Sequence, residues 1–284
     1  MVPVSIGMPV YNGEKYLDSA LAALSSQTFT DFLIIISDNA STDSTPDIIS
    51  EWVAKDPRIS VYRQCENIGS TLNFDWVLRK AEGSWFMFAA YDDLWSSNYV
   101  DVLYRAATAK PDIKLAAPLI VQINRDGNEN RRRPFYDPIG VSSRFRRVWM
   151  SLRHVRSAWY YGLFNRNALI DAWDKSRGFK YAWANDFLML LPILLSGDVT
   201  GSNDAIFYQR ITNVSYGLIP STLSAQKDLF RTFLRESLHI FRDAPLSTVE
   251  RAMLYPLLLH YVDRHAWRAH RLIRSSIKEY FGIK

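Results

Sequence analysis

Polar and acidic residues follow three of the short apolar segments in the N-terminal third of the chain. In an open α/β sheet, ligands bind beside the carboxyl ends of parallel strands, so residues at such ends are the first candidates for chemistry. Carboxylates, amides and a tyrosine ring are suited to holding a nucleotide or a metal ion. The residues that follow these segments are Pro9, Tyr11, Asn12 and Glu14 after the first, Ser37, Asp38, Asn39 and Asp43 after the second, and Tyr91, Asp92 and Asp93 after the fourth.

The adjacent pair Asp92 and Asp93 is the sharpest chemical feature. Hard divalent cations prefer carboxylate oxygens, and magnesium is often held by one or two carboxylates together with substrate phosphates. A metal ion here would neutralise a bound diphosphate. The alternative is that the pair caps a helix beginning near Ser97. The segment from Asp38 to Asp43 is no calcium loop, because it has no glycine at its sixth position and no distal glutamate.

The elements that position these residues are predicted from periodicity. Apolar runs alternate with amphipathic stretches, which indicates βαβ units and a mainly parallel sheet. Thr45 before Pro46 is typical of a helix N-cap followed by a first-turn proline. The arginine-rich stretch 125–144 is expected to be a long loop. The expected strands are 4–8, 33–37, 59–63, 85–89 and 115–121, and the expected helices are 14–26, 46–54, 72–81, 99–109, 187–195 and a helical region from 227 onward.

Composition indicates a globular protein of a reducing compartment. The chain has 284 residues, 48% hydrophobic and 22% charged. The single cysteine, Cys65, excludes an internal disulfide framework and a thiolate zinc cluster. No basic leader precedes the first apolar segment, and the longest apolar stretches, 187–195 and 253–262, are too short to cross a bilayer. We therefore expect a cytoplasmic protein without a membrane-spanning segment.

The net charge of +5 comes from the C-terminal region. Residues 227–284 carry 11 Lys and Arg against 6 Asp and Glu, whereas the two signs balance in residues 1–226. Apolar residues such as Leu254 and Leu258 beside Arg264 and Arg271 resemble an interfacial helix attracted to anionic lipid. Packing of the same face onto the rest of the protein is an equally good interpretation. No nucleic-acid motif accompanies the basic residues, so no nucleic acid is expected as a partner.

Four motifs occur in order over about 90 residues, whereas the glycine-rich signatures of dinucleotide and P-loop sites are absent. The motifs are Val4 to Asn12 with Glu14, Ser37 to Asp43, Asn67-Ile68-Gly69 with Asn73, and Tyr91-Asp92-Asp93. In this order they resemble the motifs of the inverting family 2 glycosyltransferases, which have the GT-A fold. The resemblance implies an α/β, Rossmann-like fold with a mainly parallel central sheet flanked by helices.

The resemblance also implies roles for individual residues. Residues 1–226 would form the GT-A domain, with a donor half, 1–110, and an acceptor half, 111–226, and 227–284 would be a helical basic tail. A divalent metal, Mn²⁺ or Mg²⁺, would be held chiefly by Asp93, with Asp92 beside the donor's ribose and diphosphate. Besides Asp92, the implied donor-binding residues are Pro9, Tyr11, Asn12, Glu14, Asp38, Asn39, Asn67, Gly69, Asn73 and Arg210.

Asp186, in the dipeptide Asn185-Asp186, lies where the family has an acidic pair whose second member is the catalytic base. It would take a proton from an acceptor hydroxyl in a single in-line displacement. Asp186 as a cap of helix 187–195 is the structural alternative. Trp159 and Tyr160, together with Asn185, are weaker candidates for acceptor binding, since aromatic rings are also the commonest large core residues.

The sequence departs from the family pattern at two places. Ala90 replaces the first acid of a full Asp-x-Asp-Asp, and Ile211 and Thr212 follow Arg210 where the family often has a histidine that binds metal or diphosphate. Arg210 is expected to supply charge to the phosphates instead.

The function expected from the resemblance is transfer of a single sugar from a nucleotide-sugar. UDP is the default nucleotide, and the acceptor would be a glycan or lipid-linked saccharide of cell-surface polysaccharide synthesis, at the inner face of the membrane. A catalytically silent nucleotide- or glycan-binding module remains open because of Ala90 and the missing histidine. A sugar-nucleotide nucleotidyltransferase is a third reading, against which stands the lack of a glycine-rich basic signature near the first strand.

Overall fold

The computed structural model describes residues 2–138, 141–211, 220–267, 269 and 271–273. The chain forms two compact units that interleave along the sequence. Unit 1 contains residues 1–137, 158–171 and 198–211, and unit 2 contains 138–157, 172–197 and 212–284. This grouping by proximity does not follow the expected boundary near residue 226. The division into a donor half, an acceptor half and a tail concerns roles and stays a prediction.

The sheet of unit 1 has the order β3-β2-β1-β4-β8-β6-β9-β5, with β7 paired to β6, among the described residues. Strands β1, β2, β3 and β4 run parallel, as do β6 and β9, whereas β8 is antiparallel to β4 and β6. The mainly parallel α/β architecture is thus confirmed. The strands are β1 (Val4–Val10), β2 (Phe32–Asp38), β3 (Ile59–Arg63), β4 (Trp85–Phe88), β5 (Leu94–Trp95), β6 (Leu115–Ile123), β7 (Glu129–Arg133), β8 (Leu163–Asn165) and β9 (Val199–Arg210).

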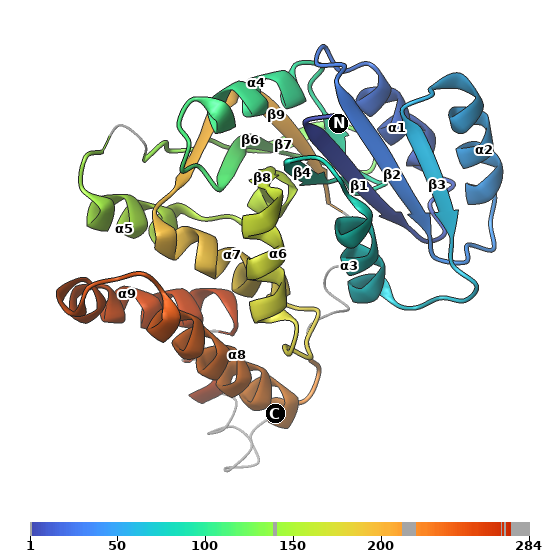
Figure 1. Ribbon diagram of the computed structural model, residues 1–284. Coiled ribbons are helices and arrows are strands. Elements are labelled where there is room, and N and C mark those ends of the chain that lie inside the picture. Colours follow the sequence, from blue (N-terminus) through green and yellow to red (C-terminus); the bar gives the residue numbers. More distant parts are fainter. Residues whose placement is uncertain (1, 139–140, 212–219, 268, 270, 274–284) are drawn as a thin grey trace. The chain divides into compact units, whose positions relative to one another are not determined.

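The core of unit 1 forms because its central strands are apolar on both faces. All seven residues of β1 are buried, as expected for a parallel strand covered by helices on either side. Right-handed crossovers place α1 and α2 on one face, and α3, which leads back across the sheet to β4, on the other (Figure 1). The helices of this unit are α1 (Leu17–Ser25), α2 (Thr45–Lys55), α3 (Ser70–Lys80) and α4 (Tyr99–Thr108), and α6 (Arg166–Ser176) begins in it.

Two local predictions were wrong. Thr45 is the first residue of α2 rather than its N-cap, and its hydroxyl accepts the Gly13 N–H at 2.7 Å. The stretch 125–144 is not one loop, because β7 pairs antiparallel with β6. The connecting turn is stabilised by Asn124, whose Oδ1 accepts two backbone N–H groups, and by Gly127 at φ +88°.

Unit 2 is built mainly from four helices that contact one another in a closed ring: α5 against α7, α7 against α8, α8 against α9 and α9 against α5. Their bounds are α5 (Arg144–His154), α7 (Asn185–Ser196), α8 (Leu223–Asp243) and α9 (Thr248–His265). A capping box between Ser247 and Glu250 fixes the start of α9. Helices α8 and α9 confirm the expected helical region from residue 227 as far as His265, and the part of that prediction that falls on residues 268, 270 and 274–284 lies outside the described residues. None of the helices in the described part of the chain has both the length and the apolar content for a membrane span.

Candidate functional site

The predicted donor residues of unit 1 lie at one edge of the sheet. In the parallel register Val10 is level with Asp38, so the segments that follow β1 and β2 leave the sheet side by side. Strands β3 and β4 end at the same edge, because they are parallel to β2 and β1. Tyr11 is 41% exposed at this edge, whereas Pro9 is buried in β1.

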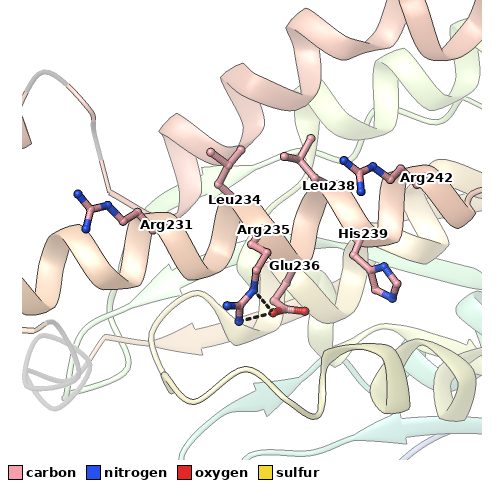
Figure 2. Close-up of a pocket in the computed structure, with 7 residues that line it drawn as sticks. All are labelled: Arg231, Leu234, Arg235, Glu236, Leu238, His239 and Arg242. Atoms are coloured by element: carbon pink, nitrogen blue, oxygen red, sulfur yellow. Dashed lines mark hydrogen bonds and ion pairs between the residues drawn. The ribbon is translucent and has the colours of Figure 1, made fainter.

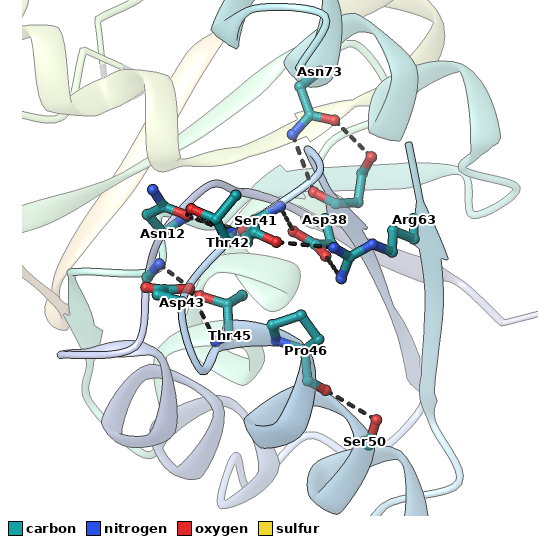
Figure 3. Close-up of polar contacts among 12 residues, drawn as sticks. Asn12, Asp38, Ser41, Thr42, Asp43, Thr45, Pro46, Ser50, Arg63 and Asn73 are labelled. Atoms are coloured by element: carbon teal, nitrogen blue, oxygen red, sulfur yellow. Dashed lines mark hydrogen bonds and ion pairs between the residues drawn. The ribbon is translucent and has the colours of Figure 1, made fainter. Parts of the chain in front are cut away.

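The turn after β1 is tied to the loop after β2 by reciprocal hydrogen bonds (Figure 3). The Asn12 N–H donates to the Ser41 hydroxyl at 3.0 Å, and Asn12 Oδ1 accepts the Thr42 N–H at 2.9 Å. Asn12 adopts φ 50°, a left-handed conformation that asparagine tolerates better than most residues.

Glu14 extends the same join between the two loops. Its backbone N–H donates to Asp43 Oδ2 at 3.1 Å, and its carboxylate accepts the Ser44 N–H at 3.1 Å. Glu14 itself stays exposed. The two loops therefore form one connected wall, to which Asn12 and Glu14 contribute structure as well as exposed polar atoms.

Asp38 ends β2 and is 1% exposed. Its Oδ2 forms an ion pair with Arg63 Nη1 at 2.9 Å, and its Oδ1 accepts the Ser41 N–H at 3.0 Å. The second Arg63 nitrogen donates to the Ser41 carbonyl at 2.9 Å (Figure 3). The Arg63 side chain stays about half exposed, at 51%. An exposed guanidinium with a fixed orientation thus lies beside the buried Asp38 carboxylate. The sequence analysis did not single out Arg63, although its position at the end of an expected strand was visible.

Asn39 and Asn73 are both 2% exposed and hold backbone and side-chain groups of neighbouring loops. Asn73 donates to the Ser37 carbonyl at 3.0 Å and accepts the Ser37 hydroxyl at 2.6 Å. Asn39 donates to Asn67 Oδ1 at 2.8 Å and accepts the Ile68 N–H at 2.9 Å. These buried amides set the shape of the edge.

Asn67 and Gly69 are the exposed members of the third motif. Asn67 Oδ1 accepts the Gly69 N–H at 2.9 Å. Gly69 has φ +82°, and a Cβ added there would meet no atom within 4 Å. The backbone conformation, rather than crowding, therefore calls for glycine at this turn.

Asp92 and Asp93 differ in their surroundings. Asp93 is 4% exposed, and its Oδ1 accepts the Arg210 N–H at 2.7 Å. Asp92 is partly exposed, and none of the described residues forms a side-chain hydrogen bond or ion pair with its carboxylate. Burial raises the pKa of both carboxyls, and the neighbouring Asp92 charge raises the pKa of Asp93 further. Helix α4 begins at Tyr99 and its N-cap is Asn98, so the pair does not cap that helix.

Arg210 holds the Asp92-Asp93 loop in place. Its Nε donates to the Asp92 carbonyl at 2.8 Å, and its Nη1 donates to the carbonyls of Asn124 and Arg125. The guanidinium also lies 4.4 Å from the centre of the Tyr16 ring. With 9% exposure and these partners, Arg210 is a support of the loop, and its predicted contact with phosphates stays a prediction.

Asp186 belongs to unit 2, in the first turn of α7. The N-cap of α7 is Ala184, at φ 68°, so Asp186 is not the cap. Burial raises the Asp186 pKa from 3.8 to about 6, against the lowering effect of the Phe187 N–H. Beside it, Asn185 Oδ1 is buried without a hydrogen-bond partner. A carboxyl with such a pKa is mostly ionised at neutral pH and is suited to accepting a proton.

Trp159 and Tyr160 do not present ring faces to solvent. They are 2% and 9% exposed, Trp159 packs on Phe135, and Tyr160 stacks on Phe88 at 4.8 Å. Their interpretation as acceptor-binding residues is corrected accordingly: they belong to the core of unit 1, since large rings gain most by burial.

The family model for "Glycosyl transferase family 2" matches residues 5–172, which include all of the predicted donor-binding residues except Arg210. The chain belongs to this family. Glycosyltransferase GlyA of Streptococcus pneumoniae serotype 4 is 27% identical over 172 residues, 61% of this chain and 24% of that protein. TuaG of Bacillus subtilis, described as a putative teichuronic acid biosynthesis glycosyltransferase, is 31% identical over 98 residues, 34% of this chain and 39% of that protein. The chain therefore spans well under half the length of these curated relatives.

Solved structures show that this glycosyltransferase family 2 chain has the GT-A fold. Residues 1–349 of Staphylococcus aureus TarS in complex with UDP-GlcNAc give a TM-score of 0.65 at 19% identity, covering 92% of this chain and 72% of that one. The mannosyltransferase PcManGT of Pyrobaculum calidifontis, in complex with GDP-Man and Mn²⁺, gives 0.56 at 15% identity, covering 92% and 69%. At such identities the likeness extends to the fold alone.

The carboxylates of this family 2 chain fit a divalent metal that is completed by a ligand. No cluster of three or more His, Cys, Asp and Glu side chains suited to a metal occurs among the described residues. Asp92, however, offers a half-buried carboxylate to which no other described residue forms a hydrogen bond or ion pair, although the nearby Arg210 charge opposes the rise in its pKa. Magnesium-type ions commonly use one or two carboxylates with substrate phosphates. Asp92 is thus better placed to meet a metal than Asp93, whose Oδ1 is already bound to Arg210.

Proposed function

We propose that the protein transfers a single sugar, with inversion, from a nucleotide-sugar to a glycan or lipid-linked saccharide acceptor of cell-surface polysaccharide synthesis. The observation that carries the proposal is the edge of the unit 1 sheet, where the half-buried Asp92 carboxylate and the oriented Arg63 guanidinium lie among exposed polar loops. UDP is the nucleotide we propose, because TarS is solved with UDP-GlcNAc and with UDP. TuaG, by its name, gives the polysaccharide context.

Donor binding is assigned to residues with free polar atoms at the edge. The Tyr11 ring is exposed and can stack on a base, and Arg63 can donate to the base while it keeps its ion pair with Asp38. Asn67 and Gly69 provide the turn beyond β3. The buried residues Asn39 and Asn73 hold these groups at fixed positions, which reduces the entropy lost on binding.

Asp92, with Asp93 behind it, would hold the divalent metal. When bound, that ion would neutralise charge on the diphosphate leaving group. The chain itself supplies a buried support for this loop, because Asp93 and Arg210 fix its backbone. Metal dependence follows as a proposal, in keeping with the Mn²⁺ present in the PcManGT structure.

We assign the general base to Asp186. Its carboxylate would accept the proton of the acceptor hydroxyl while that oxygen forms a bond to the anomeric carbon and the bond from this carbon to the diphosphate oxygen breaks. Attack opposite to the leaving group inverts the anomeric configuration. Asn185 Oδ1, which has no hydrogen-bond partner among the described residues, would accept a hydrogen bond from a hydroxyl of the acceptor sugar.

Calorimetric titration tests the donor assignment. UDP, GDP, dTDP and CMP are each titrated with and without Mn²⁺, and we expect selective binding of UDP that the metal strengthens. Absence of binding by every nucleotide, in a sample whose circular dichroism shows a folded protein, would contradict the proposal. Nucleotide binding without sugar transfer to any lipid-linked or glycan acceptor would favour the silent module instead.

The proposed acceptor gives the protein a place at the cytoplasmic face of the membrane. The basic region 227–284 is the part of the chain that we propose for peripheral contact with anionic lipid. Fractionation of cells that express the full chain tests this location: the protein should sediment with membranes at low salt and be released by high salt.

A further inference from the structure

Helix α9 has an outward face that is apolar and exposed. Val249, Met253, Tyr255 and Leu259 are between 41% and 68% exposed, although each is large and apolar. They form two pairs at i, i+4 spacing, Val249 with Met253 and Tyr255 with Leu259, on either side of the surface opposite the buried Leu254 and Leu258. Scattered apolar residues on a surface need no explanation, but a pair that continues onto a neighbouring helix can form a binding surface.

The side of α8 next to α9 combines exposed arginines with partly exposed leucines (Figure 2). A hollow of about 540 Å³ is lined by residues of this helix: Arg231, Leu234, Arg235, Glu236, Leu238, His239 and Arg242. In Figure 2 the two leucines project to one side of α8, and Arg235 with its neighbours Glu236 and His239 projects to the other.

The leucines lie on the side of α8 that faces α9. Leu234, Leu238 and Phe241 share one stripe of the helix, at i, i+4 and i+7. The Phe241 ring is 6.5 Å from the Tyr255 ring of α9, and α8 and α9 contact each other within unit 2. Leu259 is one turn further along α9 than Tyr255. The apolar side chains of the two helices therefore form one strip, with Arg231 and Arg242 along its α8 margin.

The charges beside the strip are available for a partner. Arg231 and Arg242 are exposed, and neither forms an ion pair with a described residue. The acid one turn before Arg231, Asp228, forms its ion pair with Lys180 at 2.7 Å, and the Arg231 charge makes only a smaller contribution to the lowered Asp228 pKa. On the opposite flank of α8, Arg235 is paired with Glu236 at 2.8 Å.

We propose that the outward face of α8 and α9 docks on an anionic lipid bilayer, with Tyr255 and Leu259 in the interface and Arg231 and Arg242 on lipid phosphates. An apolar strip bordered by unpaired guanidinium groups complements such a surface in both polarity and charge. A second copy of the chain would bring the same arginines together, which disfavours self-association. The inference rests on the proposed function in one respect: a lipid-linked acceptor gives the docking its purpose.

Vesicle co-sedimentation of the full chain tests the proposal. The vesicles are pure phosphatidylcholine and phosphatidylcholine mixed with phosphatidylglycerol. We expect binding to the mixed vesicles only, reduced at least about 30-fold in the double variant R231E/R242E, because removing two basic residues from an anionic interface costs about that much before the added negative charges are counted. L259D tests the apolar strip and should also weaken binding to the mixed vesicles.

The matched control is K55E/R105E, which changes the net charge equally at exposed helical positions of unit 1. It should bind the mixed vesicles like the unaltered chain. Equal loss in this control, equal binding to both vesicle types, or no binding at all would overturn the proposal. Dimerisation in analytical ultracentrifugation that L259D abolishes, without vesicle binding, would overturn it in favour of a second copy. UDP titration of the same samples separates failure of docking from failure of the donor site.

Discussion

The backbone N–H of Arg210 donates to the Asp93 carboxylate at 2.7 Å, and the Arg210 side chain returns a bond to the Asp92 carbonyl at 2.8 Å. The end of β9 is thereby fixed to the loop after β4, and β5 adds a further link because Leu94 pairs with Tyr208. The two adjacent aspartates consequently have different surroundings: Asp93 is buried and holds the loop by its hydrogen bond to Arg210, and Asp92 is the residue that we propose for the ligand.

Matched asparagine variants distinguish these tasks. D92N should weaken Mn²⁺-dependent UDP binding about tenfold or more, because it removes the carboxylate that meets the metal. D93N should keep UDP affinity within a few fold, since an amide oxygen can still accept the Arg210 N–H. Titration calorimetry with and without Mn²⁺ provides the comparison. The reverse order of losses would return the principal metal role to Asp93.

Replacement of Arg210 should mainly destabilise the Asp92-Asp93 loop, and any effect on phosphate binding should be secondary. R210K loses the forked contacts to the Asp92, Asn124 and Arg125 carbonyls, with an expected cost of about 1–3 kcal/mol in the free energy of unfolding. Urea denaturation measures it. A variant with unchanged stability but much weaker UDP binding would instead support the predicted phosphate contact.

The ion pair between Asp38 and Arg63 gives a third prediction. R63M leaves the buried Asp38 carboxylate without its charged partner and should lower the free energy of unfolding by about 1–2 kcal/mol, a discounted figure because Arg63 is half exposed. The double variant D38N/R63M should recover part of that loss. UDP affinity, in contrast, should stay reduced in the double variant if Arg63 contacts the base.

Sequence patterns predicted the fold well wherever a local run of residues was enough to determine the secondary structure. The strands 4–8, 33–37 and 59–63 were found within two residues, because runs of apolar residues between turns have few alternatives. Thr45 was misassigned because its hydroxyl is used by Gly13, 32 positions away in the chain. A threonine that caps a helix and a threonine whose hydroxyl accepts a hydrogen bond from a distant residue cannot be told apart in the sequence.

The motifs predicted which residues gather at the site, but not which of them support the fold and which are left exposed to a ligand. Asp92 and Asp93 are identical in type, and only the approach of β9 makes one of them structural. Arg63 lay outside every motif, and its orientation depends on the loop after β2. Trp159 and Tyr160 were ambiguous for the opposite reason, since rings that bind sugars and rings that fill cores share one composition.

The raised pKa of Asp186, about 6, leads to a prediction on activity. A general base must be ionised, so the rate of sugar transfer at low substrate concentration should fall as the pH decreases through about 6. D186N should abolish transfer and leave UDP affinity within a few fold, because the donor residues belong to unit 1. Steady-state rates of both proteins across pH 5 to 8, at roughly constant ionic strength, make the comparison. A normal rate in D186N would show that another group is the base.

The same pKa has a consequence for stability with the opposite sign. Asp186 keeps its proton in the folded state up to pH of about 6, whereas the unfolded chain loses it near 3.8, so folding is favoured at low pH and loses this contribution as the pH rises between those values. D186N should therefore be more stable than the unaltered chain at pH 7.5 by about 3 kcal/mol, because each unit of the pKa difference corresponds to about 1.4 kcal/mol, and about equally stable near pH 4. Thermal unfolding at the two pH values measures the difference. Lower stability of D186N at pH 7.5 would mean that the carboxylate is held by contacts that outweigh its burial.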